Sequence, residues 1–240
     1  MPRGGYATGA TVNSDGPGHD LANFLTTALL LGVIGYIAID LYRATARGAT
    51  ASGELPVPTE PLSLAGAQTT GSAQARAGLI VFSDFECASC GRFARETLSF
   101  LRRQYVDHNL LKIAHRHYLL PTHQHALRLA QAADCAAAQG RFWDAHDRIF
   151  GTSSTRFSLV IHDLPDDLGL DETAYASCVS TDERTFIQDD RRLAVRLGVT
   201  GTPTVFVGRF AENDVLLVSA VIRGAQPTAV FRDAIERVLR

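Results

Sequence analysis

Apolar residues follow two kinds of pattern in the C-terminal part of the chain. Short apolar or β-branched runs predict strands at residues 79–82, 110–118, 204–207 and 215–222, the last two separated by a glycine-containing turn. Helical spacing predicts helices at residues 90–106, 123–139, 141–150, 159–164, 171–179 and 183–197, and a last helix from Pro227, placed at its first position. This order predicts an α/β fold whose mixed sheet has a parallel pair joined by a crossover and an antiparallel hairpin near the end.

The helix predicted at residues 183–197 is amphipathic. Its apolar face consists of Phe186, Ile187, Leu193, Ala194 and Leu197, and Asp190 is the only polar residue on that face. An apolar face of this kind is expected to pack on the core.

The pattern is different before residue 62. Residues 1–20 are rich in Gly, Asp, Asn, Thr and Pro without periodicity, which predicts a flexible arm. Residues 21–39 form a 19-residue stretch without a charge, long enough to cross the hydrocarbon core, and we expect one transmembrane helix at residues 21–43. Residues 44–61, rich in Ala, Thr, Gly, Ser and Pro, read as a tether. The globular domain is expected over residues 62–240, with one short edge strand in residues 62–76.

A cleaved signal peptide is the alternative to the anchor, but the preceding segment is not basic and no clear cleavage site follows. Orientation is a conflict between two rules. Arg43 and Arg47 after the span favour a cytoplasmic domain, whereas a stable disulfide would favour an oxidising compartment. We expect a single-pass membrane protein whose domain lies on the extracytoplasmic, periplasmic side.

Composition excludes one class of partner. The 23 Lys and Arg residues nearly balance the 25 Asp and Glu residues, for a net charge of −2, and no basic block exceeds two residues. The sequence therefore indicates no nucleic-acid surface.

The candidate chemistry lies at the first strand-to-helix junction. The run 79–82 leads into Cys87-Ala88-Ser89-Cys90, where a helical pattern starts. A helix N-terminus favours a thiolate, and two thiols at this spacing can close and reopen a disulfide. Half of a zinc site is the alternative, but the chain has no second Cys-x-x-Cys to complete it. We expect no metal and no organic cofactor.

Cys135 and Cys178 are the other two cysteines of the four. An even count with one close and one distant pair fits a redox pair plus a structural disulfide. Two buried free thiols are the alternative for the distant pair.

These motifs together resemble the DsbA-like branch of the thioredoxin superfamily. The stretch Phe82-Ser83-Asp84-Phe85-Glu86-Cys87 is similar to the branch's active-site motif, and Gly201-Thr202-Pro203-Thr204 is similar to the superfamily's cis-proline loop. The residues around Cys135 and the helical segments between the two motifs are also typical of this branch. The resemblance covers residues 62–240 and implies a thioredoxin-like mixed sheet with an inserted helical block at about residues 121–182.

The resemblance implies roles for individual residues. Cys87 would be the nucleophile and Cys90 the resolving thiol. A cis bond before Pro203 would expose the backbone of Thr202 to an extended substrate strand. Asp84 and Glu86 flank the site, where one of them could transfer a proton to or from Cys90, although a capping or solvated role is the simpler interpretation.

The histidines admit a metal or a structural interpretation. His115, His117, His123, His125 and His146 are spread over several predicted elements. We therefore expect them to be surface or structural residues.

The expected function is that of an enzyme: a membrane-anchored thiol–disulfide oxidoreductase acting on protein thiols or disulfides, served by a membrane redox partner. The residues between the cysteines, Ala88 and Ser89, differ from the Pro-His pair typical of DsbA. This difference predicts a cysteine pair that is less oxidising than that of DsbA, whose reduction potential is roughly −120 mV. The redox direction and the client proteins stay open. The alternative is a structural or assembly subunit of a larger membrane complex, because a fold does not fix a function.

Overall fold

The computed structural model describes residues 25, 27–39, 56–181, 185–211 and 214–240, and the chain divides into two units, Met1–Gly53 and Glu54–Arg240. In the first unit, residues 27–39 are helical, and their side chains are exposed, Leu29 to 72% and Leu31 to 65%. Within the described part of the chain, none of the helices has the length and apolar character needed to cross a membrane. Apart from Leu25, the other residues of the predicted span 21–43, together with the predicted arm and most of the tether, lie outside the described residues.

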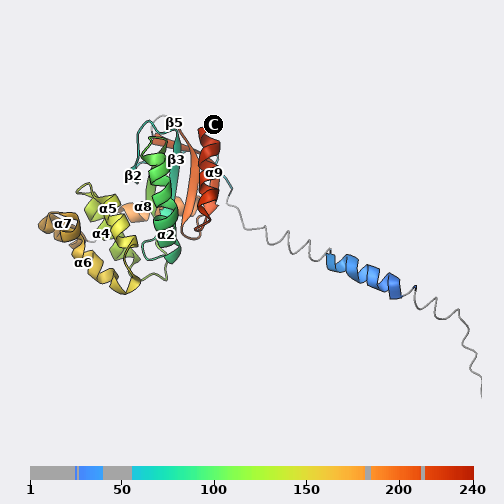
Figure 1. Cartoon of the computed structure of the whole chain (residues 1–240). Helices are drawn as coiled ribbons and strands as arrows, with labels where there is room; N and C mark the ends of the chain where they lie inside the picture. Colours follow the sequence, from blue (N-terminus) through green and yellow to red (C-terminus); the bar gives the residue numbers. More distant parts are fainter. Residues whose placement is uncertain (1–24, 26, 40–55, 182–184, 212–213) are drawn as a thin grey trace, which may run out of the picture. The chain divides into compact units, whose positions relative to one another are not determined.

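The second unit is built on a mixed sheet, six-stranded among the described residues, in the order β1-β6-β5-β3-β4-β2. The strands are β1 (Leu62–Ser63), β2 (Gln68–Thr70), β3 (Ala77–Ser83), β4 (Leu111–His117), β5 (Thr204–Ala211) and β6 (Val215–Arg223). The β3–β4 pair is parallel and β5–β6 is antiparallel, which confirms the predicted mixed α/β sheet (Figure 1). Two short strands, not one, precede residue 77.

The first crossover is one continuous helical segment with π-helical turns. It consists of α2 (Ala88–Arg92), η1 (Phe93–Leu98), α3 (Ser99–Leu101) and η2 (Arg102–Val106). The helix predicted at residues 90–106 thus begins two residues earlier, directly after Cys87. The cysteine pair therefore lies at the N-terminal end of this helical segment, directly after the turn that follows β3.

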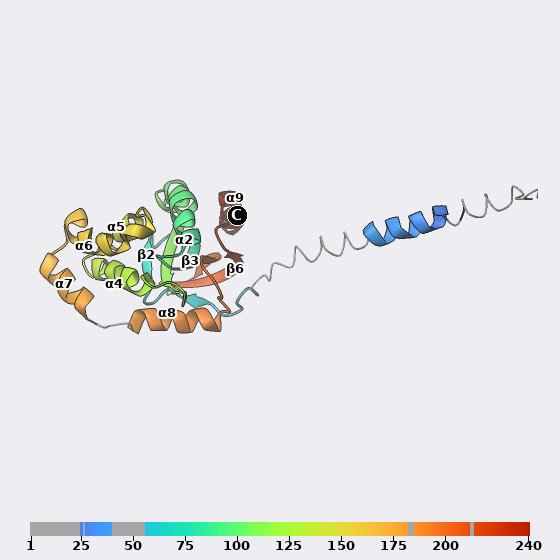
Figure 2. The same ribbon diagram turned by 90° about the horizontal axis from the view of Figure 1, so that it is seen from below.

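The helical block inserted between β4 and β5 is observed. Its helices are α4 (Ala126–Ala137), α5 (Phe142–Phe150), η3 (Ser154–Arg156), α6 (Phe157–Leu168), α7 (Glu172–Ser180) and α8 (Thr185–Arg196). The helices α4 to α7 gather beyond one end of the sheet, whereas α8 lies along one of its faces (Figure 2). The last helix, α9 (Thr228–Leu239), has Pro227 as its N-cap and not as its first residue.

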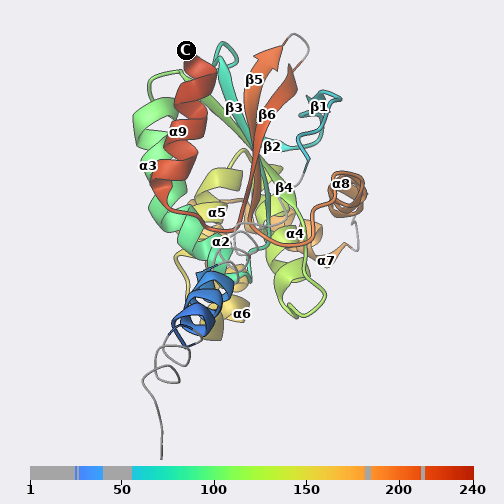
Figure 3. The same cartoon turned by 90° about the vertical axis from the view of Figure 1, so that its right-hand side faces the viewer.

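The two faces of the sheet are covered by different helices (Figure 3). On one face α9, with Phe231, and the α2–η2 segment, with Phe93, pack over Leu79 and Val81 of β3. On the other, α8 places Ala194 with Ile80 and Phe206. Odd and even positions of β3 point to opposite faces, as the period of a strand requires, and all seven of its residues are buried.

Two local predictions need correction. Gly208 lies inside β5 and not in the hairpin turn. The strand needs a glycine there because a Cβ would stand 2.1 Å from the carbonyl oxygen of Leu217 on the neighbouring strand. Phe186 is 57% exposed although it shares the apolar face of α8, because it lines a cavity of about 200 Å³ beside Cys178 instead of the sheet.

Candidate active site

Cys87 and Cys90 lie where the predicted junction places them. β3 ends at Ser83, and Cys87 is the N-cap of α2, in an extended conformation. The Cys87 N–H donates to the carbonyl of Asp84 at 3.1 Å, and the Gly91 N–H donates to the carbonyl of Cys87 at 3.0 Å. Both cysteines are free thiols in this structure, and Cys87 is the more accessible, with 9% exposure against 0% for Cys90.

The loop before β5 meets the cysteine pair. The Thr202–Pro203 peptide bond is cis. The Cys87 thiol donates to the carbonyl oxygen of Thr202 at 3.5 Å. The loop is held by the Thr204 hydroxyl, which donates to Gly201 O at 2.7 Å, and by the Gly224 N–H, which donates to Pro203 O at 2.7 Å. Two motifs far apart in the sequence thus form one site.

The two thiols have opposite acidities. Hydrogen bonding from the Cys90 thiol is the main cause that lowers the pKa of Cys87 from 9.0 to about 5. Burial opposes this shift, and the side chain of Thr202 and the backbone amides of Cys90 and Ser89 add to it. Burial, followed by the hydrogen bond and negative charge of Cys87, raises the pKa of Cys90 well above its usual range. At neutral pH, Cys87 is therefore a thiolate and Cys90 a thiol, the arrangement that an attacking and a resolving sulfur need.

The carboxylates of Asp84 and Glu86 accept backbone hydrogen bonds in the loops around the site. Asp84 is fully buried, and its carboxylate accepts hydrogen bonds from the N–H groups of Glu86 and Leu120, both at 2.8 Å. Glu86 accepts from the N–H of His125 at 2.6 Å. Among the described residues, neither carboxylate forms a hydrogen bond with a cysteine sulfur. Their geometry joins the β3–α2 turn to the loop that follows β4.

Cys135 on α4 and Cys178 on α7 form a disulfide with a Cα–Cα distance of 5.7 Å. The bond joins two helices of the inserted block, and Cys135 belongs to the same core cluster as Cys87 and Cys90. Cys135 is buried, and Cys178 is half-buried.

Three histidines gather in the core beside the site, although the sequence pattern scattered them over separate elements. His115 and His117 of β4 have ring centroids 5.0 Å apart, and His146 of α5 lies 5.6 Å from His115. Phe85 stacks on His115 at 5.3 Å. The alternation of His115 and His117 along one strand was the available signal for a shared face. No group of His, Cys, Asp or Glu side chains in the described ranges is arranged to hold a metal ion.

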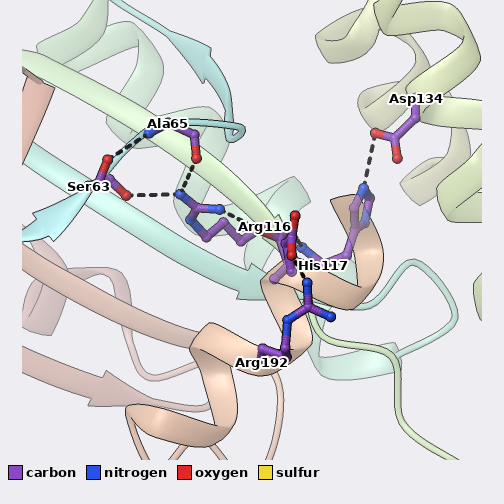
Figure 4. Close-up of polar contacts among 8 residues, drawn as sticks. Ser63, Ala65, Arg116, His117, Asp134 and Arg192 are labelled. Atoms are coloured by element: carbon purple, nitrogen blue, oxygen red, sulfur yellow. Dashed lines mark hydrogen bonds and ion pairs between the residues drawn. The ribbon is translucent and has the colours of Figure 1, made fainter. Parts of the chain in front are cut away.

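Asp190 has a buried partner that the sequence did not reveal. Its carboxylate pairs with Arg116 at 2.5 Å and accepts the His117 N–H at 2.8 Å. Figure 4 shows that Arg116 reaches back to the carbonyls of Ser63 and Ala65, while His117 points away from them to Asp134. The ion pair of Arg116 and Asp190 thus joins α8 to β4, and Arg116 also joins β4 to the segment around β1.

Comparison with known proteins supports the same fold. The thioredoxin family profile matches residues 65–214. The chain belongs to the thioredoxin family. Among solved structures it is similar to α-DsbA1 of Wolbachia pipientis, with a TM-score of 0.62 and 20% identity over 74% of this chain and 92% of that one. BdbD of Bacillus subtilis gives a TM-score of 0.63 with 19% identity over 76% and 98% of the two chains. DsbA2 of Pseudomonas aeruginosa gives 0.55 with 25% identity over 71% and 92%. The thioredoxin-like fold with a helical insert is therefore that of DsbA-type proteins.

The curated relatives are longer than this chain. An alignment of 178 residues, which covers 68% of this chain, is 30% identical to Na⁺/H⁺ antiporter NhaA 3 of Salinispora tropica. An alignment of 160 residues, which covers 65% of this chain, is 32% identical to the Na⁺/H⁺ antiporter NhaA of Herminiimonas arsenicoxydans. In both cases the match covers 25% of the relative, so this chain spans about a quarter of the length of the curated relatives it matches.

Proposed function

We propose that this protein is a thiol–disulfide oxidoreductase that exchanges disulfides with protein substrates through Cys87 and Cys90. The observation that carries the proposal is the contrast between the two thiols: the pKa of Cys87 is lowered to about 5 and that of Cys90 is raised. A thiolate at neutral pH is the attacking species in exchange, and a buried second thiol beside it can release the product.

The reaction balances with these two sulfurs alone. The Cys87 thiolate attacks a substrate disulfide, a mixed disulfide forms, and the first substrate sulfur leaves as a thiolate. Cys90 then loses its proton and attacks Cys87 Sγ, which forms the Cys87–Cys90 disulfide and releases the second substrate sulfur. The pair has given two electrons to the substrate. Read backwards, the same steps oxidise a substrate dithiol, and no metal or organic cofactor enters either direction.

The substrate is proposed to bind along the loop before β5. The Thr202 carbonyl faces the Cys87 thiol at 3.5 Å. An extended peptide that pairs with the Thr202 backbone beside Pro203 would bring its own sulfur next to Cys87 Sγ, a contact of the strand-addition type. Strand addition recognises the backbone of the substrate, so it favours unfolded or extended protein segments over small thiols.

Proton transfer to or from Cys90 through Asp84 or Glu86 stays a proposal. Asp84 is already occupied by three hydrogen-bond partners in the loops. Glu86 is only half-buried, so water can reach it.

Single-pass membrane anchoring, with a periplasmic domain, is also proposed. Its support is the uncharged stretch 21–39 and the exposed apolar side chains of the helix at residues 27–39. Carbonate extraction of membranes tests the anchor, and labelling of reduced Cys87 by an impermeant thiol reagent on intact cells tests the side. Release by carbonate would contradict the first proposal, and protection of Cys87 the second.

The rival function is that of a subunit or assembly factor in a larger membrane complex. The observation that favours it is the match to Na⁺/H⁺ antiporters, of which this chain corresponds to only a quarter. A Cys87→Ser/Cys90→Ser variant that keeps every cellular function, together with stable co-purification of a membrane transport protein, would favour this rival over the oxidoreductase.

The test of the leading proposal is the trapping of mixed disulfides. In a Cys90→Ser variant the resolving step is blocked, so Cys87 should accumulate bonded to substrate proteins. The Cys87→Ser/Cys90→Ser variant is the matched control and should trap none. Equal adducts in both variants, or adducts in neither, would refute the proposed exchange.

A further inference from the structure

The motif between the cysteines carries no charge. Its two residues are Ala88 and Ser89, so a cation that stabilises the Cys87 thiolate has to come from another segment. His123, in the loop between β4 and α4, is such a group. Its Nδ1 lies 2.8 Å from the Oδ2 atom of Asp84, and its side chain is 22% exposed.

Asp84 forms hydrogen bonds with both His123 and Cys87. The carboxylate of Asp84 is fixed by the N–H groups of Glu86 and Leu120, each at 2.8 Å, and it is 0% exposed. The carbonyl of the same residue accepts the N–H of Cys87 at 3.1 Å. One buried residue thus positions the imidazole with its carboxylate and the nucleophile with its backbone.

Three acidic groups, Asp84, Glu86 and the Cys87 thiolate, act on the charge of His123. Glu86 is held to the same loop because it accepts the N–H of His125 at 2.6 Å. Burial disfavours the imidazolium, but the hydrogen bond and charge of Asp84 and the charges of Glu86 and Cys87 outweigh it and raise the pKa of His123. Attraction between two charges is mutual, so a cation that gains from the thiolate also stabilises it.

We propose that protonated His123 stabilises the Cys87 thiolate from outside the Cys-x-x-Cys motif and thereby tunes the redox potential of the Cys87–Cys90 pair. The inference rests on the proposed oxidoreductase function. His123 does not touch substrate in this scheme; it acts as a charged residue positioned by Asp84. Its loss should make the reduced state less stable relative to the disulfide, because a more acidic attacking thiol belongs to a more oxidising couple.

The test uses His123→Asn in the full-length reduced protein. The asparagine amide can still donate to Asp84 but carries no charge. The thiolate absorbance of Cys87, followed against pH, should shift so that the pKa of Cys87 rises by about one unit, the size expected for loss of a nearby cation. The equilibrium constant with glutathione should move about tenfold toward the disulfide.

Two variants separate charge from structure. His125→Asn, in the same loop, is the matched control: its ring packs near Phe157 at 6.1 Å and makes no bond to Asp84, so the pKa of Cys87 should not change. His123→Lys restores a positive charge and should restore most of the thiolate stability. The wild-type pH profile of Cys87 alkylation should show a second inflection from His123, absent from His123→Asn and from His123→Lys.

The outcomes distinguish this inference from the function on which it rests. An unchanged pKa of Cys87 in folded His123→Asn, or an equal rise in His125→Asn, would overturn the role of His123 and leave the oxidoreductase proposal standing. A wild-type pair that never equilibrates with glutathione would refute the oxidoreductase proposal, while the absorbance titration would still report on His123.

Discussion

The thiol of Cys87 lies 3.5 Å from the carbonyl oxygen of Thr202, although 115 positions separate them in the sequence. This contact places the accessible sulfur of the pair against the loop proposed to receive substrate. Cys90 lies behind it, fully buried. The site is therefore asymmetric, with one sulfur facing outward and one inward.

The low pKa of Cys87 depends chiefly on its partner thiol. Hydrogen bonding from Cys90 is the largest cause of the shift to about 5. Replacing Cys90 by Ala removes this donor, so the pKa of Cys87 should rise, whereas Cys90→Ser keeps a hydroxyl donor and should retain more of the shift. The pH dependence of iodoacetamide alkylation measures this. Identical profiles for the two variants would contradict the hydrogen-bond explanation.

The stability of the reduced protein should depend on pH through the same thiol. The pKa of Cys87 is lower in the folded state, about 5, than its ordinary value of 9.0, so the folded thiolate adds stability that is complete above pH 9 and is lost as the pH falls through 5. The free energy of unfolding of the wild type relative to Cys87→Ser should therefore increase between pH 5 and pH 9. Urea denaturation under reducing conditions measures it, and a constant or falling difference would argue against a depressed pKa.

The buried pair of Arg116 and Asp190 should be costly to break. Both side chains are nearly inaccessible, at 6% and 5% exposure. Asp190→Asn leaves a buried guanidinium without its counter-charge, and we expect a loss of about 3–5 kcal/mol in urea denaturation. The neighbouring Asp189 pairs with Arg192 on the surface, so Asp189→Asn is a matched control that should cost less than about 1 kcal/mol. Equal losses for the two variants would refute the buried role.

The Cys135–Cys178 disulfide joins residues of the inserted block that are 43 positions apart in the sequence. Its removal in Cys135→Ala/Cys178→Ala should lower the free energy of unfolding by about 2–4 kcal/mol through the larger entropy of the unfolded chain. Thiol exchange at Cys87 should persist at neutral pH, since the free pair is held by the β3–α2 junction and not by α4 or α7. A variant that keeps wild-type stability, or one that is folded but loses exchange, would contradict this separation of roles.

Local patterns were sufficient for much of the fold. The buried run 79–82 and the alternating helical and strand periods predicted the sheet and its crossover, because core burial dictates both periods. The positions of Cys87 and Cys90 followed from the strand–helix junction alone. Gly208 was misplaced because a glycine in a strand and a glycine in a turn look the same until the neighbouring strand is present.

The partners of buried polar residues could not be predicted from a single sequence. Asp190 stood out as the one polar residue on an apolar helix face, yet nothing in the pattern named Arg116 as its partner. His123 looked like one scattered histidine among several, because its bond to Asp84 forms only when the loop after β4 folds over the end of β3. Such pairs depend on tertiary contacts that periodicity does not encode.

The redox equilibrium of the Cys87–Cys90 pair with glutathione tests most directly whether this site performs thiol–disulfide exchange. The oxidised fraction, measured by alkylation and mass spectrometry across a series of glutathione ratios, should follow a single two-electron transition at a potential below about −120 mV, the value of DsbA. Cys87→Ser should lack the transition. A wild-type pair that stays reduced at every ratio would contradict the proposed function, and a potential at or above that of DsbA would contradict the weaker oxidising power expected from Ala88 and Ser89.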